Sequence, residues 1–304
     1  MGCKIIIEDT NKMMDSKMNI CIQGLKKFEE IKIILETNCF YNINAPMNWS
    51  ENTFWQSEAI FLSDSNGIVS LKNSPSKGGD YIGIRDMGLF ESLKAVSIVN
   101  KKHIRDLKNL PLNDVVSYKI SVLSDGKLLA KTTFNRFYKN YNINHYDILR
   151  DSWQGRLFYE EDKNKKPAII VLSGSDGGIE KAQNIAMMLS NHGFVTLAIS
   201  YFGMNNQKSS LDRIPLENIE EALKYNKVES VLETGEEEDI FYATDAAYDA
   251  GARTILAWSF RGAESNTYKS ERCDYLWNII GEAMRRIKDR NLDEIRNEFY
   301  SKKK

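Results

Sequence analysis

The sequence predicts two architectures in one chain: an antiparallel β-sandwich, followed by an α/β domain with a parallel sheet. Strand-like runs separated by turn signals fill residues 1–138, with no helical periodicity between them. From residue 166 onward, apolar runs alternate with segments of helical periodicity. The totals fit a globular chain, because 42% of its 304 residues are hydrophobic and 27% are charged.

The predicted sandwich consists of short strands joined by tight turns. Asn66-Gly67 and Asp125-Gly126 predict two hairpins, since glycine accepts the positive φ of such turns. Residues 140–151 are polar and aromatic without a period, so we place the domain boundary there and expect a sandwich domain over 1–140. The strands expected in it are 19–25, 31–36, 54–62, 68–71, 115–123 and 127–138.

The α/β part is organised around residues 166–203. Ala168–Leu172 is a short unbroken apolar run, typical of a parallel strand that is buried on both faces. The glycine-rich turn Gly174–Gly178 follows, and then a helix with one apolar stripe over 182–189. A second strand is expected at 194–199, which makes a right-handed βαβ crossover with the glycine turn at its ligand-binding edge.

Further elements are expected on both sides of this crossover. Residues 233–239 hold five acidic side chains in seven positions and are interpreted as a solvated loop or helix start, because no histidine accompanies them to suggest a metal site. Strands are predicted at 155–160 and 254–258, and helices at 214–225, 241–250 and 274–288.

Composition excludes several classes of function. A net charge of −1 gives no electrostatic reason to expect nucleic acid as a partner. No apolar run approaches the roughly 20 residues that a membrane-spanning helix needs, and the first residues lack the pattern of a signal peptide. Four scattered cysteines without a CxxC pair indicate reduced thiols in a cytoplasmic protein. We expect no metal and no cofactor.

Several motifs resemble one enzyme family. Gly78–Tyr81 and Asp86–Phe90 resemble the end of the N-terminal domain of the acyl-CoA thioester hydrolase / bile acid-CoA:amino acid N-acyltransferase family. Leu172–Ile179 and Ile214–Glu217 resemble parts of its α/β-hydrolase domain, as do 154–158 and 192–194. The resemblance covers residues 15–225. It implies an immunoglobulin-like sandwich that regulates access to an α/β-hydrolase domain, and residues 151–226 would be the first part of that hydrolase domain.

The family's chemistry, by the same resemblance, uses a Ser or Cys nucleophile with Asp and His on fatty acyl-CoA thioesters. Its oxyanion loop would correspond to Gly174, Ser175, Asp176 and Gly177, although a tight turn needing glycine is the other interpretation. No G-x-S-x-G motif follows Pro215.

The nearest nucleophile motif is residues 258–264, in which Phe260 occupies the nucleophile position. Ser259 is the candidate nucleophile that remains, but it comes one residue early and on a strand would face the other way. Triads of this type place histidine last in the chain, yet His103, His145 and His192 all precede it and Cys273 has no histidine downstream. We predict an incomplete triad.

The tail, 227–304, matches the family poorly, and we interpret it as a diverged or foreign α/β segment ending in helices. Residues 246–260 faintly resemble a late strand of a glycosidase-type barrel, with Glu264 as one carboxylate, but one strand cannot make a barrel. The preferred function is an acyl-CoA thioester hydrolase or acyltransferase of fatty acid metabolism with weak or no activity. The alternative is a non-catalytic relative that binds an acyl chain or a partner, or a truncated fusion product.

Overall fold

The computed structural model describes residues 2–40, 48–161, 166–174, 177–210, 212–215, 217–226, 230–235 and 254–259. The chain forms two compact units. In the described part, the first unit contains residues up to 102 together with 115–137, and the second contains 103–114 and the residues from 138 onward. Residues 103–114 therefore interrupt the first unit in sequence and belong to the second.

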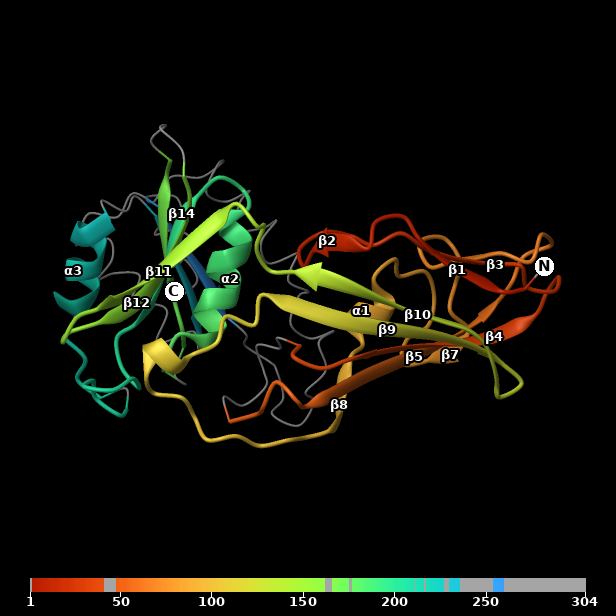
Figure 1. Cartoon of the computed structure of the whole chain (residues 1–304), viewed down its shortest axis with the longest axis horizontal. Coiled ribbons are helices and arrows are strands. Elements are labelled where there is room, and N and C mark those ends of the chain that lie inside the picture. Colours follow the sequence, from red (N-terminus) through yellow and green to blue (C-terminus); the bar gives the residue numbers. More distant parts are fainter. Residues whose placement is uncertain are drawn as a thin grey trace, which may run out of the picture. The chain divides into compact units, whose positions relative to one another are not determined.

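The first unit contains two sheets. A three-stranded sheet has the order β1-β3-β6, and a seven-stranded sheet has the order β2-β10-β9-β4-β5-β7 with β8 beside β5. Figure 1 shows β4, β5, β9 and β10 running alongside one another. The strands are β1 (Lys4–Ile7), β2 (Asn11–Met13), β3 (Ile20–Gln23), β4 (Glu30–Thr37), β5 (Phe54–Leu62), β6 (Val69–Ser70), β7 (Gly78–Gly79), β8 (Lys94–Ser97), β9 (Val115–Ser124) and β10 (Lys127–Phe137), and a short helix α1 spans Gly88–Glu91.

Alternation of side chains builds the core of the larger sheet. Along β4, Ile31, Ile33 and Leu35 are buried while their neighbours are exposed or half-buried. Residues of a strand point alternately to the two faces of its sheet, so this period places one face inward. Trp55 on β5 is 2% exposed and packs against the rings of Phe40 and Trp49 at centroid distances of 5.3 and 5.9 Å.

One of the two predicted hairpins is confirmed. β9 and β10 pair antiparallel around Asp125 and Gly126, whose φ values of 47° and 75° are those of a tight two-residue turn. The turn at Asp64–Gly67 also forms, but the hairpin prediction was wrong, because β6 pairs with β3 in the other sheet and not with β5. A Cβ on Gly67 would meet the carbonyl oxygen of Leu25, so this glycine lets the turn approach the end of β3 closely.

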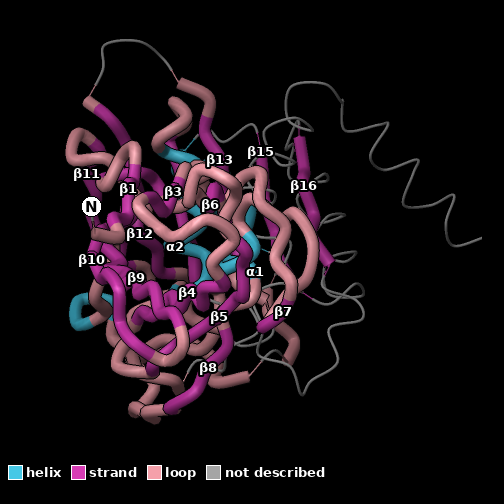
Figure 2. The backbone as a smooth tube through the Cα atoms, turned by 90° about the vertical axis from the view of Figure 1, so that its right-hand side faces the viewer, coloured by secondary structure: helices cyan, strands magenta, loops and turns pink. Residues whose placement is uncertain are grey.

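The second unit is built on a six-stranded sheet with the order β11-β12-β14-β13-β15-β16. β12 pairs antiparallel with β11 and β14, whereas the pairs β13·β14, β13·β15 and β15·β16 are parallel. Figure 2 shows β13, β15 and β16 in succession. The elements are η1 (Leu107–Asn109), β11 (Ile143–Leu149), β12 (Gln154–Glu160), β13 (Ala168–Leu172), α2 (Glu180–Ser190), β14 (Val195–Ser200), α3 (Glu217–Asn226), β15 (Ser230–Gly235) and β16 (Thr254–Ser259).

The predicted βαβ crossover is confirmed. All five residues of β13 are buried, and β14 lies beside β13 in parallel register. Helix α2 buries Ala182, Ile185, Ala186 and Leu189, as their spacing predicted. The helix ends before Gly193, whose φ of +87° is a conformation that glycine adopts easily.

Two strands of this sheet were missed from the sequence. β11 lies at the sheet edge within the segment 140–151 that was expected to be aperiodic, and most of its residues are at least partly exposed, so it gives no apolar run. β15 lies between β13 and β16, and its last residues are the start of the acidic segment 233–239 that was interpreted as a loop or helix start. The strand at 254–258 is confirmed as parallel, but it is not next to β13.

The remaining predicted elements have mixed outcomes. The strand at 155–160 and the helix at 214–225 are confirmed as β12 and α3, with slightly different ends. The helices predicted at 241–250 and 274–288 lie outside the described residues.

Candidate active site

The glycine turn after β13 lies at the carboxyl edge of the sheet, the edge at which open α/β sheets bind ligands. Gly177 and Gly178 have φ values of +69° and +67°. The N–H of Gly177 donates to the carbonyl of Gly174 at 3.1 Å, and the N–H of Gly178 donates to the carbonyl of Phe202 at 3.0 Å. The first hydrogen bond closes the turn on itself, and the second holds it against the segment that follows β14.

This geometry bears on the predicted oxyanion loop. Ser175 and Asp176 lie outside the described residues, whereas Gly174 and Gly177 are described. Because the N–H of Gly177 is already donated within the turn, it would reach an oxyanion only after that hydrogen bond opened.

Gly177 supplies a test of how closely the turn is packed. A Cβ on Gly177 would lie 2.8 Å from Cε2 and 3.0 Å from the carbonyl oxygen of Phe202, whereas Gly193, with φ +87°, has no atom within 4 Å of that position. We expect Gly193→Ala to cost about 1 kcal/mol through positive φ alone. Gly177→Ala should cost about 1–3 kcal/mol more through overpacking. Urea unfolding of both variants measures the difference, and equal losses would show that the turn gives way without cost.

Polar atoms without hydrogen-bond partners gather around the turn. Next to the turn, they are Oγ of Ser173, Nε2 of His103 and both carboxylate oxygens of Glu180, all of them buried. Elsewhere in the described residues, side-chain atoms of Arg136, Trp153 and Asn184 share this condition. A buried polar atom without a partner costs roughly 1–3 kcal/mol, so such groups in a native structure call for an explanation.

His103 lies beside this turn and not in the sandwich, where the sequence interpretation put it. Its Nε2 is 3.3 Å from Oε1 of Glu180, and it would be 3.4 Å from a Cβ on Gly178. The two atoms are close enough to pair, but they lack hydrogen-bond alignment. Both side chains keep some exposure, 23% for His103 and 16% for Glu180.

Residues 103–114, which we call the strap, bring His103 to this place. Leu107 and Leu110 of the strap form a buried cluster with Ile179 and Met204, which follow β13 and β14. The N–H of Asn205 also donates to the carbonyl of Arg105 at 2.6 Å. The strap is therefore packed on the carboxyl edge of the sheet, next to the glycine turn.

Arg156 on β12 anchors the strap and is 4% exposed. Its guanidinium makes a two-pronged ion pair with Asp147, with Nε donating to Oδ1 at 2.6 Å and Nη2 donating to Oδ2 at 3.2 Å. Nη2 also donates to the carbonyls of Leu107 and Leu110, both at 3.1 Å. One buried cation thus ties the strap to β11 and β12.

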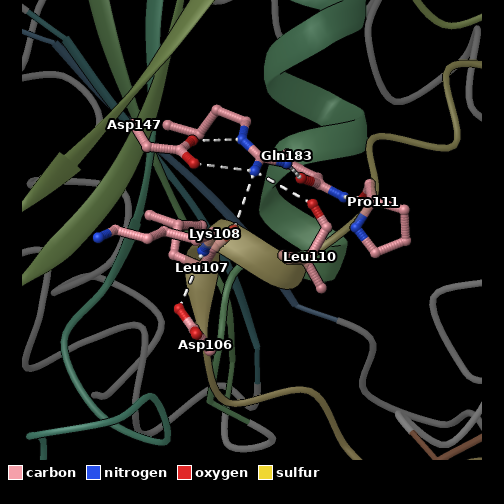
Figure 3. Close-up of polar contacts among 8 residues, drawn as sticks. Asp106, Leu107, Lys108, Leu110, Pro111, Asp147 and Gln183 are labelled. Carbon is pink, nitrogen blue, oxygen red and sulfur yellow. Dashed lines mark hydrogen bonds and ion pairs between the residues drawn. The ribbon is translucent and has the colours of Figure 1, made fainter.

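Gln183 completes this anchor from helix α2. Its side-chain carbonyl accepts from Nη1 of Arg156 at 2.9 Å, and its amide donates to the carbonyl of Pro111 at 3.1 Å. Figure 3 shows Asp147, Gln183 and the strap carbonyls converging on one centre. A charged residue in the middle of an otherwise apolar strand, Arg156 in GRLFY, is the sequence signal that could have revealed the anchor.

The other two histidines occupy different places. His145 lies on β11, which β12 and β14 separate from β13. Although much of the ring stays exposed, partial burial lowers the pKa of His145, and Arg156 and Lys139 lower it further. His192 follows α2 and is exposed. The structure therefore brings His103 to the glycine turn and places His145 and His192 on other elements.

The position of β16 bears on the candidate nucleophile. A nucleophile must lie near the donors that hold the oxyanion, so its strand should be next to β13. Ser259 ends β16, which is two strands from β13 and hence about 10 Å across the sheet. The neighbour of β13 on that side is β15, and the sequence that follows it, 236–253, contains no serine or cysteine.

The cysteines in the described part of the chain are partly buried. Cys3, Cys21 and Cys39 are free thiols on the first unit. Burial raises the pKa of the Cys39 thiol to about 11, so that thiol is protonated and weakly nucleophilic at neutral pH. Phe260, Glu264 and Cys273 lie outside the described residues.

The described residues hold neither a metal-ligand cluster nor a membrane-spanning helix. In that part of the chain, no three His, Cys, Asp or Glu side chains are grouped so that they could hold a metal ion. No helix there is long and apolar enough to cross a membrane.

Parts of the chain are similar to one known protein family and to several characterised proteins. Residues 15–149 match the family described as acyl-CoA thioester hydrolase/BAAT N-terminal region. Mouse acyl-coenzyme A amino acid N-acyltransferase 1 is 29% identical over 231 residues, which cover 74% of this chain and 52% of that protein. Mouse bile acid-CoA:amino acid N-acyltransferase is 26% identical, with coverages of 73% and 51%.

A thioesterase is among the relatives as well. Human mitochondrial acyl-coenzyme A thioesterase 2 is 22% identical, covering 74% of this chain and 44% of that protein. The chain spans about half the length of the curated relatives it matches. Among solved structures, the thioesterase domain from the curacin biosynthetic pathway is 15% identical with a TM-score of 0.30 over 38% of this chain and 45% of that one, too low a likeness to carry an argument.

Proposed function

We propose that this chain, whose residues 15–149 match the acyl-CoA thioester hydrolase/BAAT N-terminal region, binds a fatty acyl-CoA thioester and turns it over weakly or not at all. Its relatives are named for acting on acyl-coenzyme A, either as N-acyltransferases or as thioesterases. The single observation that carries the second half of the proposal is the strand next to the glycine turn, β15, which leads into a sequence without a serine or cysteine.

The low activity follows from proton transfer. A serine hydroxyl is a poor nucleophile until a base removes its proton, and such help is worth about 10²- to 10⁴-fold in rate. Ser259 is about two strand spacings from β13, roughly 10 Å. No histidine follows it in the sequence. The family's Ser, acid and His therefore have no complete counterpart in this chain's order.

The same proposal assigns parts of the chain. We take 1–140 as an immunoglobulin-like sandwich domain, 151–226 as the first part of an α/β-hydrolase domain, and 227–304 as a diverged tail, all in a cytoplasmic protein. Gly174, Ser175, Asp176 and Gly177 would form the oxyanion loop if the hydrogen bond from Gly177 to Gly174 opens on binding.

A second candidate function is binding without catalysis. It is favoured by the closed glycine turn, because the N–H groups of Gly177 and Gly178 are both donated to backbone carbonyls. A relative that retained only the acyl-CoA site would bind the thioester and leave it intact. An assay of free CoA distinguishes the two functions, because binding alone releases no CoA and weak catalysis releases it slowly.

Hydrolysis of acyl-CoA by the purified chain tests the proposal. We expect saturable binding of palmitoyl-CoA by calorimetry, and release of free CoA below about 1 s⁻¹ for acyl chains from acetyl to palmitoyl. Ser259→Ala should leave that rate unchanged, as should Ser209→Ala, a matched change at an exposed site. Turnover at about 1 s⁻¹ or faster that Ser259→Ala alone abolishes would reject the proposal.

A further inference from the structure

We propose that His103 and Glu180 form a proton-transfer pair at the glycine turn, in which His103 activates water for attack on an acyl thioester and Glu180 orients the imidazole. This inference rests on the proposed binding of acyl-CoA and names the residues through which any remaining hydrolysis proceeds. It requires no serine or cysteine nucleophile.

His103 and Glu180 are placed like a base and its orienting group, at contact distance but without an aligned hydrogen bond. A histidine that acts as a base is held by a third group through its other ring nitrogen. Nε2 of His103 faces Oε1 of Glu180 at 3.3 Å, which leaves Nδ1 to receive a proton. The side chain of His103 keeps 23% of its surface exposed although Nε2 is buried, so water reaches another part of this side chain.

The unpaired polar atoms indicate that the site is built for a ligand. Nε2 of His103 and both oxygens of Glu180 are buried without an aligned hydrogen bond, and Oγ of Ser173 shares this condition. An ion pair that served stability alone would gain by aligning. Catalytic hydrogen bonds, in contrast, are often long in the empty enzyme and tighten when the reactant is bound.

The location agrees with this role. Nε2 of His103 lies 3.4 Å and Oε2 of Glu180 lies 2.6 Å from the place that a Cβ on Gly178 would occupy. The pair therefore adjoins the turn at the carboxyl edge of β13, where a ligand of such a sheet binds. Gly178 has no side chain, and this absence allows both groups to approach the backbone.

The strap holds His103 in place. Arg156 fixes the carbonyls of Leu107 and Leu110, four and seven residues beyond His103, and Gln183 fixes Pro111. An imidazole on a strap anchored to β12 and α2 is restrained before the reactant arrives, which is what a positioned base needs. Arg156 is a positioning residue in this scheme and does not touch the reacting atoms.

The reaction balances without any further reactant. Water gives a proton to Nδ1 of His103 while its oxygen bonds to the thioester carbonyl carbon, and the carbonyl oxygen takes up the negative charge. The C–S bond then breaks, the carbonyl re-forms, and the thiolate of CoA leaves with the proton from His103. The products are a fatty acid and CoA thiol.

Hydrolysis of phenyl thioacetate, an activated thioester that needs no CoA site, tests the pair directly. We expect the wild-type chain to hydrolyse the thioester faster than buffer alone. In His103→Gln, this excess over the buffer rate should fall by about 10²-fold or disappear. His192→Gln, the same change at an exposed position after α2, should keep the wild-type rate. Glu180→Gln should give a smaller loss than His103→Gln.

Chemical rescue separates catalysis from structure. After subtraction of the hydrolysis that imidazole catalyses without protein, free imidazole should restore the rate of His103→Ala in proportion to its concentration. The wild-type excess over that background should stay unchanged, and a structural defect would give no excess. A wild-type rate equal to that of buffer, or a His103→Gln variant as fast as wild type, would overturn the inference. Binding of palmitoyl-CoA is measured separately, so its absence beside histidine-dependent hydrolysis would reject the proposed function alone.

Discussion

Replacing Arg156 by methionine should destabilise the second unit by about 2–4 kcal/mol, because the carbonyls of Leu107 and Leu110, which are buried in the strap, lose their hydrogen-bond donor. The carboxylate of Asp147 also loses its cation, but its side chain is 25% exposed and keeps part of its hydration. Methionine matches much of the volume of arginine, so the loss is one of charge and hydrogen bonds and not of packing.

Hydrogen exchange of residues 103–114 measures this effect where it should be greatest. We expect the amides of the strap to lose protection by more than those of β4 and β9, which belong to the first unit. Arg213→Met is the matched control, because Arg213 has a side chain that is 91% exposed and should change stability by less than about 0.5 kcal/mol. Unchanged protection of the strap in Arg156→Met would show that its apolar packing holds it without the arginine.

Replacing Trp55 by alanine should destabilise the first unit by about 3–5 kcal/mol, the usual cost of emptying a buried aromatic site. Trp55 is 2% exposed, and its ring packs against the rings of Phe40 and Trp49. Removing the indole would therefore leave a cavity and cost these two rings a packing partner. Phe28→Ala is the control, because Phe28 is 57% exposed and its ring lies 5.1 Å from Nζ of Lys27.

The same variant tests whether the two units are separate folding units. Urea unfolding followed by hydrogen exchange should show β4 and β5 opening at lower denaturant in Trp55→Ala, while β13 and β14 open at the wild-type concentration. Simultaneous opening of both sets of strands would mean that the units unfold as one, and a single free energy would then describe the chain.

The parts of the fold that could be predicted are those in which the pattern of burial gives a recognisable run or spacing of apolar residues in the sequence. β13 is buried on both faces and appears as the uninterrupted run Ala168–Leu172, and the stripe of α2 follows its 3.6-residue turn. β11 and β15 carry no such pattern. β11 lies at an edge with exposed residues, and β15 ends in Glu233, Thr234 and Gly235, which indicate a loop when they are considered alone.

The candidate site was less predictable, because it depends on contacts between distant residues. The glycine turn was located by its residue types, but the neighbour of β13 is β15, a strand that was not predicted. Ser259 on β16 is therefore one strand farther from β13 than a nucleophile should be. His103 reaches the turn only because residues 103–114 leave the first unit and are held by Arg156. The sequence positions of His103 and Glu180 do not indicate that the two residues are neighbours. An arginine within the apolar segment of β12, in contrast, could have suggested the anchor.

A single-turnover reaction with protein in excess over palmitoyl-CoA tests the central claim most directly. Samples quenched over time are analysed for free CoA and for palmitoyl groups attached to the protein. The account predicts that palmitoyl-CoA is bound, that CoA appears more slowly than about 1 s⁻¹, and that no palmitoyl group becomes attached to the chain. A rapid burst of CoA matched by palmitoyl-protein would contradict it, because a working nucleophile would then exist in the chain.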